Sequence, residues 1–493
     1  MTDAAAPVPD LSGIPASIPA TDPLAPYDAV LLLSYGGPRR PEDVLPFMRN
    51  ATAGRGVPDS RLLEVSGHYQ GFGGASPINA RNAELRDALQ ARLAERGSTL
   101  PIVVGNRNWH PFVSQALREL ADAGARRVLA LPTAAFGSYS GCRQYREDLA
   151  GAAALLAAGA DGSTGDGFEA DAAARVGGEG GAPVDLTVDK TRPYYNTPGL
   201  LEANVDAIVE AYGALAEQGV AAADVRLVLV THSIPLGMET GSAPTPESDG
   251  ASESAGAGQP AGRPAGPREP GVAADLSTEV SYVAQHRALA AILVPEVARR
   301  LGLEEVESDL VYCSRSGPPQ ARWLEPDVND HLEALAAGQL IDGSPADRPG
   351  GVVVAPFGFI SDHMEVVFDL DTEAAQTARD LGMPYVRAAT VGTHPAFVDS
   401  LVDILIERAA VARGEDVHPA STTGVGPFHT VCPPSCCRSG THHPGRHSRH
   451  GADGATHESA TGHQPAAGGS CRPASAEPES LKPASCGRMK EKR

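Results

Sequence analysis

Residues 28–34 read Asp28-Ala29-Val30-Leu31-Leu32-Leu33-Ser34, an almost wholly apolar run of strand length. Such a run is typical of a strand in a parallel sheet that helices cover on both faces, because a strand with one face in water would alternate. Six further runs follow, and longer helical patterns separate them. This alternation predicts a doubly wound α/β protein. The six runs are residues 101–105, 127–132, 226–232, 309–314, 352–357 and 385–390.

Seven strands over this length suit two similar domains better than one sheet. We therefore expect one domain over residues 27–190 and a second over residues 191–412. Residues 1–26 are expected to be disordered, as are an insertion at about 240–271 and a Cys/His-rich low-complexity tail, 413–493. Helical patterns are expected at residues 78–96, 112–123, 198–218, 277–300, 362–381 and 395–412.

The composition excludes several classes of protein. The chain has 40 basic and 61 acidic side chains and a net charge of −21, which argues against a nucleic-acid partner. No apolar run approaches the ~18–20 residues that cross a bilayer, and the N-terminus has no secretory pattern. Seven cysteines are too few and too scattered for a disulfide framework, so they are expected to be free thiols or metal thiolates. We expect a cytoplasmic protein without a transmembrane segment.

Three polar residues follow predicted strands, where ligands bind in open α/β sheets. Tyr35 precedes a Gly-Gly-Pro turn, and its phenol could contact a ligand or hard metal, or pack at the turn. His232 could accept protons near neutral pH, bind metal, or be a capped structural histidine. Arg315 could bind a ligand carboxylate through two hydrogen bonds, or form a salt bridge.

Three carboxylates follow the strand at 352–357. Glu365, Asp369 and Glu373 are spaced four residues apart, so a helix places them on one face. Like charges stacked in this way repel, and either a divalent cation or solvent must offset the repulsion. Glu365 lies closest to the strand end, where it can meet His232. A histidine and a carboxylate across an interdomain cleft suit proton removal from a nitrogen macrocycle as a metal enters, although several hydrolases use the same pair.

Several dispersed motifs carry a resemblance to a known family. They are Leu32-Leu33-Ser34-Tyr35-Gly36-Gly37-Pro38, Gly73-Gly74-Ala75-Ser76-Pro77, Thr231-His232-Ser233-Ile234-Pro235, Ser314-Arg315-Ser316-Gly317-Pro318 with Trp323-Leu324-Glu325-Pro326, and Gly358-Phe359-Ile360-Ser361-Asp362-His363-Met364-Glu365. With them the chain resembles the ferrochelatases, which insert Fe²⁺ into a porphyrin. The resemblance implies two Rossmann-like, chelatase-type domains with parallel four-stranded sheets and a porphyrin cleft between them.

The resemblance also implies a role for each candidate residue. It makes His232 and Glu365 the catalytic pair, and leaves open whether His232 accepts pyrrole protons or ligates the incoming iron. Asp369 and Glu373 match an acidic path for iron or protons. The remaining candidates contact the substrate: Tyr35 on the opposite side of the macrocycle, Ser76 in a loop at the porphyrin mouth, and Arg315.

The resemblance is closest to the Gram-positive branch, whose members use coproporphyrin III. The polar sequence at residues 39–43 agrees, since it offers no membrane-binding lip. The expected activity is therefore insertion of Fe²⁺ into coproporphyrin III, with release of two protons, by a monomer whose iron donor is unknown. The alternatives are a protoporphyrin IX ferrochelatase or cobalt chelatase on the same fold, and a non-catalytic iron- or tetrapyrrole-binding protein.

Four cysteines form a candidate cofactor site. Cys432, Cys436 and Cys437 lie close together in the tail, and Cys142 lies in the first domain. The set is similar to the arrangement that binds a 2Fe-2S cluster in many ferrochelatases, although four thiolates also suit zinc. The adjacent Cys436 and Cys437 depart from the usual wider spacing, and a disordered Cys-containing tail is the alternative. Cys313 lies within a strand pattern and is expected to be structural.

Overall fold

The structure is a computed structural model of the whole chain, and it divides into two units, residues 1–443 and 444–493. Of the insertion predicted at about 240–271, residues 240–242 are ordered, since α7 ends at Gly241 and Ser242 is buried, and the rest lies outside the described residues. The predictions for residues 1–18 and for the tail beyond 437 also lie outside them. The residues that the structure describes are 19–54, 56–159, 182–242, 281–315, 321–433 and 436–437.

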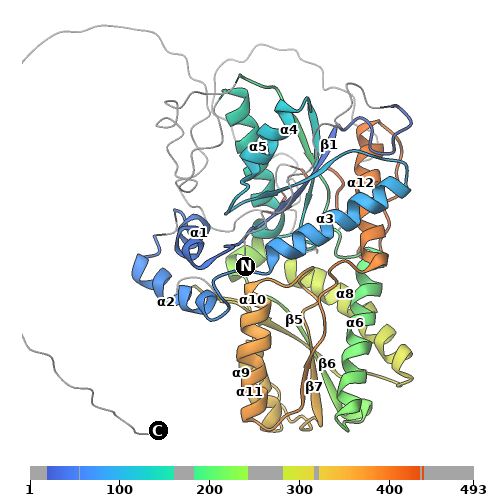
Figure 1. Cartoon of the computed structure of the whole chain (residues 1–493). Helices are drawn as coiled ribbons and strands as arrows, with labels where there is room; N and C mark the ends of the chain where they lie inside the picture. The colour runs from blue at the N-terminus through green and yellow to red at the C-terminus, as the bar shows by residue number, and fades with distance from the viewer. Residues whose placement is uncertain are drawn as a thin grey trace, which may run out of the picture. The chain divides into compact units, whose positions relative to one another are not determined.

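In the described residues the strands form two four-stranded sheets, and every strand pairing is parallel (Figure 1). The strand orders are β2-β1-β3-β4 in the first lobe and β6-β5-β7-β8 in the second, so the two sheets share one topology. This confirms the predicted fold class. The strands are β1 Ala29–Ser34, β2 Ile102–Asn106, β3 Arg127–Pro132, β4 Thr187–Lys190, β5 Val225–His232, β6 Ser308–Cys313, β7 Gly351–Ala355 and β8 Tyr385–Arg387.

Both faces of each central strand are buried, as the apolar runs predict. Along β1, Val30 and Leu32 belong to one hydrophobic cluster, whereas Leu31 and Leu33 belong to another on the opposite face. The same division occurs along β5. Side chains that point alternately to two covered faces explain why these strands carry almost no polar residues.

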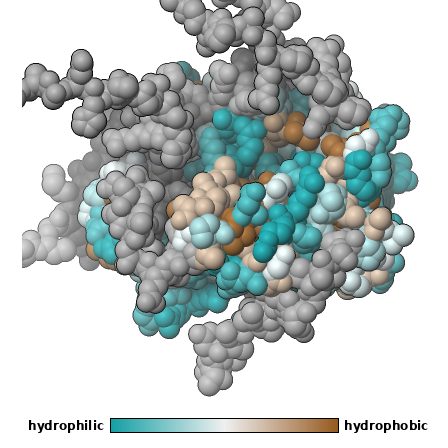
Figure 2. All heavy atoms as spheres, turned by 90° about the horizontal axis from the view of Figure 1, so that it is seen from above, coloured by the Kyte–Doolittle hydropathy of each residue, from teal (hydrophilic) through white to brown (hydrophobic). Residues whose placement is uncertain are grey.

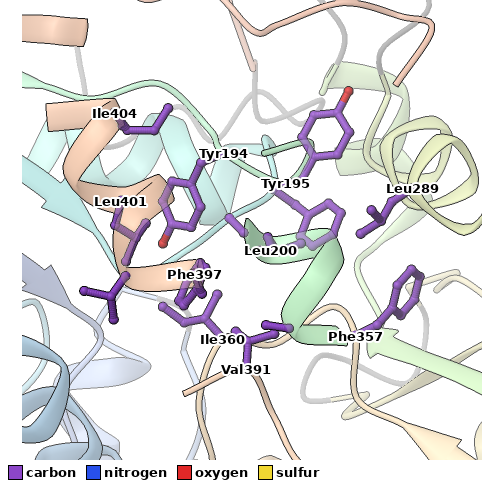
Figure 3. Close-up of a cluster of buried hydrophobic side chains, with 14 of the residues drawn as sticks. Tyr194, Tyr195, Leu200, Leu289, Phe357, Ile360, Val391, Phe397, Leu401 and Ile404 are labelled. Carbon is purple, nitrogen blue, oxygen red and sulfur yellow. The ribbon is translucent and has the colours of Figure 1, made fainter. Parts of the chain in front are cut away.

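One hydrophobic core joins the two lobes. It includes Leu129 from β3 and Leu229 from β5, together with residues of α6, α8 and α12. Figure 3 shows Tyr195, Phe357 and Phe397 within this shared cluster. The lobes are therefore not separate globules, since each lobe completes the core of the other.

The helices cover the sheets and connect the lobes. The last helix, α12, contacts both α6 and α3, and Arg92 of α3 forms an ion pair with Asp399 of α12 (Figure 1). The helices are α1 Val44–Ala51, α2 Asp59–Gln70, α3 Ile78–Glu95, α4 Val113–Asp122, α5 Gln144–Ala157, α6 Pro198–Glu217, α7 Leu236–Gly241, α8 Tyr282–Leu301, α9 Val328–Ala336, α10 Met364–Phe368, α11 Ala375–Asp380 and α12 Pro395–Ala412.

Two segments expected to be disordered contribute to the fold. Residues 19–26 form turns, and Leu24 is fully buried, so the expectation of disorder to residue 26 is wrong for this part. In the tail, Phe428 is buried and the Asn196 side chain donates hydrogen bonds to Thr423 and to the Gly426 carbonyl. Low complexity indicated disorder here, but short polar segments can pack when a core supplies the partners.

The predicted helix over residues 362–381 is interrupted. α10 ends at Phe368, a π-helical turn spans Asp369–Ala374, and α11 follows. A π-turn inserts an extra residue and rotates the side chains that follow it, and such turns are frequent at functional sites. The interruption therefore falls on the acidic residues that the sequence analysis singled out.

No helix among the described residues combines the length and the apolar character needed to span a bilayer. On the face that Figure 2 shows, hydrophilic and hydrophobic described residues are interspersed.

Candidate active site

The site begins at the carboxyl end of β5, one of the two central strands of the second sheet. His232 is the last residue of β5, and its Nδ1 donates a hydrogen bond to the carbonyl oxygen of Ser233. This bond fixes the ring and directs Nε2 away from the main chain. Nε2 lies 3.4 Å from Oε1 of Glu365, so the two residues meet. Both belong to the second lobe, because Glu365 follows β7, so the expectation that they face each other across an interdomain cleft is wrong.

Glu365 lies between two imidazoles. It belongs to the first turn of α10, and its second oxygen, Oε2, lies 3.5 Å from Nδ1 of His363. Sequence reasoning did not assign His363 a role, although it stands two residues from Glu365 in the same motif. The side chains of His232 and Glu365 are 29% and 45% exposed, so a ligand could reach both.

The pair shifts the pKa of each partner. Burial alone would lower the pKa of His232, but the Glu365 carboxylate and its hydrogen bond outweigh burial and raise that pKa above the ordinary value. Burial would raise the pKa of Glu365, but His232 and then His363 hold it at about 2. The pair therefore stabilises an imidazolium beside a carboxylate, which suits a site that receives protons.

Asp369 occupies the next position of the acidic series. Ser314, which follows β6 in a left-handed conformation with φ 66°, donates a hydrogen bond from Oγ to Oδ2 of Asp369. Burial raises the pKa of Asp369 to about 7, and the charges of Glu365 and Glu373 contribute in the same direction. Glu373 is exposed. The three carboxylates thus form a series from the histidine to the surface, and Asp369 can change protonation near neutral pH.

The first lobe contributes aromatic residues. Tyr35 follows β1 and is 39% exposed, and the guanidinium carbon of Arg107 lies 5.9 Å from its ring centroid. Burial raises the pKa of Tyr69 on α2, and the charges of Glu365, Tyr35 and Asp369 raise it further, so this phenol lies near all three groups. Sequence reasoning missed Tyr69 and Arg107, because tertiary contacts rather than a local pattern bring them to the site.

The turn that presents Tyr35 needs glycine. Gly36 adopts φ +80°, and a Cβ on Gly37 would lie 2.6 Å from Cβ of Ser76. Ser76 is 8% exposed and its main-chain N–H donates to the Pro38 carbonyl oxygen at 2.9 Å. In the structure Ser76 therefore supports the turn beneath Tyr35, and its contact with a substrate stays a prediction.

Arg315 forms an ion pair with Glu325 in the structure. The distance from Nη1 of Arg315 to Oε1 of Glu325 is 3.5 Å, and the two side chains are 35% and 70% exposed. Exposed pairs of this kind contribute little stability, so a ligand carboxylate could replace Glu325. Residues 316–320, which follow Arg315 in its motif, lie outside the described residues.

The four candidate cysteines come together behind β3. Cys142 lies in a π-helical turn, Tyr139–Arg143, and the Lys190 ammonium donates to its Sγ at 3.3 Å. Hydrogen bonds from Cys432 and Cys437 lower the pKa of the Cys142 thiol against the effect of burial. Sγ of Cys436 lies 3.6 Å from Sγ of Cys437. The described cysteines are free thiols, and no three His, Cys, Asp or Glu side chains in the described part are arranged around one metal ion.

The α1–α2 segment contacts the second lobe beside the acidic series. The His68 ring of α2 stacks on Phe368 of α10, with ring centroids 3.9 Å apart. A separate cavity of about 670 Å³, lined by residues of α6 and α12 that include Glu202 and Asp403, does not contain the His232–Glu365 pair. The interdomain porphyrin cleft therefore stays a prediction.

Two lobes with parallel sheets thus carry a histidine–carboxylate pair where the strands of the second sheet end. The family model described as Ferrochelatase matches residues 27–409. The chain is 42% identical over 415 residues to the coproporphyrin III ferrochelatase of Streptomyces coelicolor, which covers 84% of this chain and 94% of the relative. It is 43% identical over 413 residues to that of Streptomyces griseus, with the same coverage. The chain belongs to the ferrochelatase family.

Among solved structures, "SirB from Bacillus subtilis with Fe3+" matches 78% of this chain and 97% of its own, with 12% identity and a TM-score of 0.37.

Proposed function

We propose that the protein inserts Fe²⁺ into coproporphyrin III, giving Fe-coproporphyrin III and two protons, in haem biosynthesis. The names of the relatives from two Streptomyces species support this substrate. The structural observation that carries the proposal is the 3.4 Å approach of His232 Nε2 to Glu365 Oε1 at the end of β5. Metal insertion needs a base that removes the pyrrole protons close to the point where Fe²⁺ enters the ring. The His232–Glu365 pair supplies such a base.

His232 is held for that task by its neighbours. With Nδ1 donating to the Ser233 carbonyl, the neutral ring has its lone pair on Nε2. Nε2 can take a pyrrole proton, which Glu365 then stabilises, or ligate the entering Fe²⁺. Both roles require a neutral ring at the start, so a proton already bound to His232 opposes insertion.

The acidic series, Glu365, Asp369 and Glu373, provides a route for protons or Fe²⁺ between the catalytic pair and solvent. Asp369, with a pKa raised by burial to about 7, can accept a proton at neutral pH or carry Fe²⁺ as a carboxylate. Glu373 is the exposed end of this series, where ions exchange with water. We infer that these two residues connect the catalytic pair to solvent.

Residues of both lobes bind and distort the macrocycle. Tyr35 faces the substrate from the side opposite His232, and Arg315 exchanges its exposed partner Glu325 for a propionate. Ser76 holds the turn at the mouth. Binding energy from the periphery of the ring offsets the cost of bending it, which tilts the pyrrole lone pairs toward the metal.

We also infer that Cys142, Cys432, Cys436 and Cys437 hold a 2Fe-2S cluster. The four thiols fit this group because each contacts at least one other, three of them are buried, and Cys142 lies beside an ammonium that favours thiolates. The cluster would supply one-electron redox chemistry. Arg143 donates to the Cys436 carbonyl and Arg146 to that of Cys432, which fastens the tail to α5.

We infer a cytoplasmic location, because the described cysteines form no disulfide and free thiols suit a reducing compartment.

The catalytic pair can be tested against a matched pair elsewhere in the chain. His394 and Asp206 lie 3.0 Å apart, and their exposures of 29% and 41% resemble those of His232 and Glu365. We expect His232→Ala and Glu365→Gln to lower insertion of Fe²⁺ into coproporphyrin III by about a hundredfold or more, with porphyrin binding retained. His394→Ala should leave the rate within about twofold. Near-normal turnover in either site variant would overturn the assignment.

The substrate is tested with the unaltered protein. Steady-state assays with coproporphyrin III and protoporphyrin IX, each with Fe²⁺ and Co²⁺, should give the highest kcat/KM for coproporphyrin III with Fe²⁺. A preference for protoporphyrin IX or Co²⁺ would favour the related chelatases, and binding without turnover would favour a non-catalytic carrier.

The cluster has its own measurement. The purified protein should show broad visible absorption that bleaches with dithionite, together with equal amounts of iron and acid-labile sulfide. A colourless protein that contains zinc would contradict the cluster.

A further inference from the structure

A buried polar group lies directly behind His232. Thr231 precedes His232 on β5 and is fully buried, and its Oγ1 lies 2.8 Å from the Tyr282 hydroxyl and 2.8 Å from Nε2 of His286. The Tyr282 hydroxyl also lies 3.1 Å from the main-chain carbonyl oxygen of His232. Tyr282 and His286 stand one turn apart on α8, and neither has been given a role above.

The contacts fix the direction of each hydrogen bond. Nδ1 of His286 lies 2.7 Å from the Tyr282 carbonyl oxygen, which can only accept, so Nδ1 carries a hydrogen. Burial lowers the pKa of His286 to about 3, so the ring is neutral at physiological pH and Nε2 has a lone pair. Thr231 must therefore donate to His286. The phenolic hydrogen of Tyr282 is then directed toward both Thr231 Oγ1 and the His232 carbonyl oxygen.

The loop that carries Glu365 rests on the same threonine. A Cβ on Gly358 would lie 2.1 Å from Thr231 Oγ1, and the Gly358 N–H donates to the Val230 carbonyl oxygen. Thr231 thus belongs to the strand that ends in His232 and contacts the loop that leads to Glu365. The orientation of one hydroxyl group influences how both halves of the catalytic pair are placed.

α8 is also attached to the first lobe at this point. The His286 ring stacks on Phe136 with centroids 3.7 Å apart, and the amide of Gln285 both accepts from the Gly137 N–H at 2.7 Å and donates to the Gly137 carbonyl at 2.8 Å. His286 and Gln285 are fully buried. The group behind His232 is therefore held by a rigid contact between the lobes.

We propose that His286 is a positioning residue for metal insertion: as a neutral acceptor it takes the hydrogen of the Thr231 hydroxyl, so that Thr231 Oγ1 accepts from Tyr282, and this chain holds the end of β5 and the Gly358 loop that present His232 and Glu365 to each other. The proposal rests on the proposed role of His232. His286 and Tyr282 touch neither substrate nor metal, and they act through the geometry of the pair. A displacement of about 1 Å at reacting groups can cost about a hundredfold in rate, so this geometry has a measurable effect.

The test compares variants that remove or restore the acceptor. His286→Leu removes it, whereas His286→Gln keeps a side-chain oxygen near the position of Nε2. Tyr282→Phe and Thr231→Val delete single hydroxyl groups with little change of shape. We expect His286→Leu, Tyr282→Phe and Thr231→Val to lower kcat by about tenfold or more, with little change in the KM for coproporphyrin III, and His286→Gln to recover most of the rate.

Two controls separate positioning from stability. Tyr212→Phe removes a buried phenol hydroxyl of α6 that has no hydrogen-bond partner in the described residues, so it should leave kcat unchanged. The double variant Tyr282→Phe/His286→Leu should be no slower than the slower single variant, because both changes break one chain of hydrogen bonds. Independent, multiplying effects, a rise in KM alone, or no rescue by His286→Gln would overturn the proposal.

The outcome also separates this inference from the proposed function. If His232→Ala is active, the catalytic pair itself is wrong. If His232→Ala is inactive while folded Tyr282→Phe and His286→Leu variants turn over normally, the pair stands and the positioning role of His286 fails.

Discussion

The ends of β3 and β7 occupy the same place in the two sheets but lead to different chemistry. Each is followed within a few residues by Phe-Gly, at Phe136 and Phe357, and the two rings meet with centroids 6.4 Å apart. Beyond β3 a π-helical turn carries Cys142, whereas beyond β7 the chain enters α10 with Glu365 and a π-helical turn with Asp369. The shared topology therefore determines the position of the functional side chains, at the carboxyl ends of the strands. The residues after Phe-Gly determine whether the site carries thiols or carboxylates.

The largest effect should come from removing the thiol beyond β3. If the proposed cluster is present, Cys142→Ser should abolish its visible absorption and lower the melting temperature, because a cluster bound by the folded state contributes its binding energy to folding. Absorption spectra and calorimetry measure both.

Two controls test that the strand ends act separately. Cys313→Ala removes another buried thiol and should keep the visible bands. His232→Ala, at the end of β5, should keep them as well. Loss of the visible absorption bands in either control would show that the cysteine site and the His232–Glu365 site do not have separate roles.

The next largest effect concerns the pair beside β7. Glu365→Gln should lower the pKa of His232, since the Glu365 charge and hydrogen bond are what raise it against burial. His232 in the variant would lose its proton at a lower pH, which NMR titration of labelled histidine measures. Glu325→Gln, which removes an exposed carboxylate paired with Arg315, is the control. An unchanged His232 pKa in Glu365→Gln would contradict the electrostatic role of the pair.

A smaller effect, on the reduction potential of the proposed cluster, is expected when Lys190 is replaced. Its ammonium lies against the Cys142 sulfur and would stabilise added negative charge, so Lys190→Met should lower the reduction potential of the proposed cluster, by on the order of tens of millivolts. Arg127→Met removes a cation from the neighbouring strand β3 that pairs with Asp189 instead, and should have less effect. A potential that rises in Lys190→Met would be inconsistent with this contact.

The smallest effect is on stability. The pKa of Asp369 is raised in the folded protein to about 7, so the folded state binds this proton more tightly than the unfolded chain does. Its contribution to stability is present at low pH and is lost as the pH rises from about 4 through 7. Asp369→Asn should therefore raise the melting temperature of chelator-treated protein by a few degrees at about pH 8, and by less at about pH 5. Equal shifts at both pH values would argue against the raised pKa.

The sequence predicted the parts of the molecule that depend on local pattern. Each of the seven apolar runs overlaps a strand, because central strands buried on both faces are apolar almost throughout. The run at 385–390 forms only the short, partly exposed edge strand β8. β4 was missed, since Thr187–Lys190 is a short edge strand with two charged residues. α2 was missed because only Leu62 is buried along it, which leaves almost no periodic signal.

The candidate site could be predicted from the sequence where its residues directly follow a predicted strand. His232 and Glu365 were placed together by that rule, and the structure gives the contact. Tyr69 and Ser314 were not predicted, because α2 brings one to the site and a left-handed residue after β6 turns the other toward Asp369. The π-helical turn at Asp369 leaves no mark in the carboxylate spacing, so its effect on the acidic series required coordinates.

The position of α12 has a consequence for how the protein is made. α12 supplies Phe397 and Leu401 to the core that both sheets share, and it forms ion pairs with α3 near the other end of the chain. A ribosome therefore releases most of the polypeptide before the first lobe can close its hydrophobic face. Until then, the residues of the first lobe that belong to the shared core lack their partners from α12.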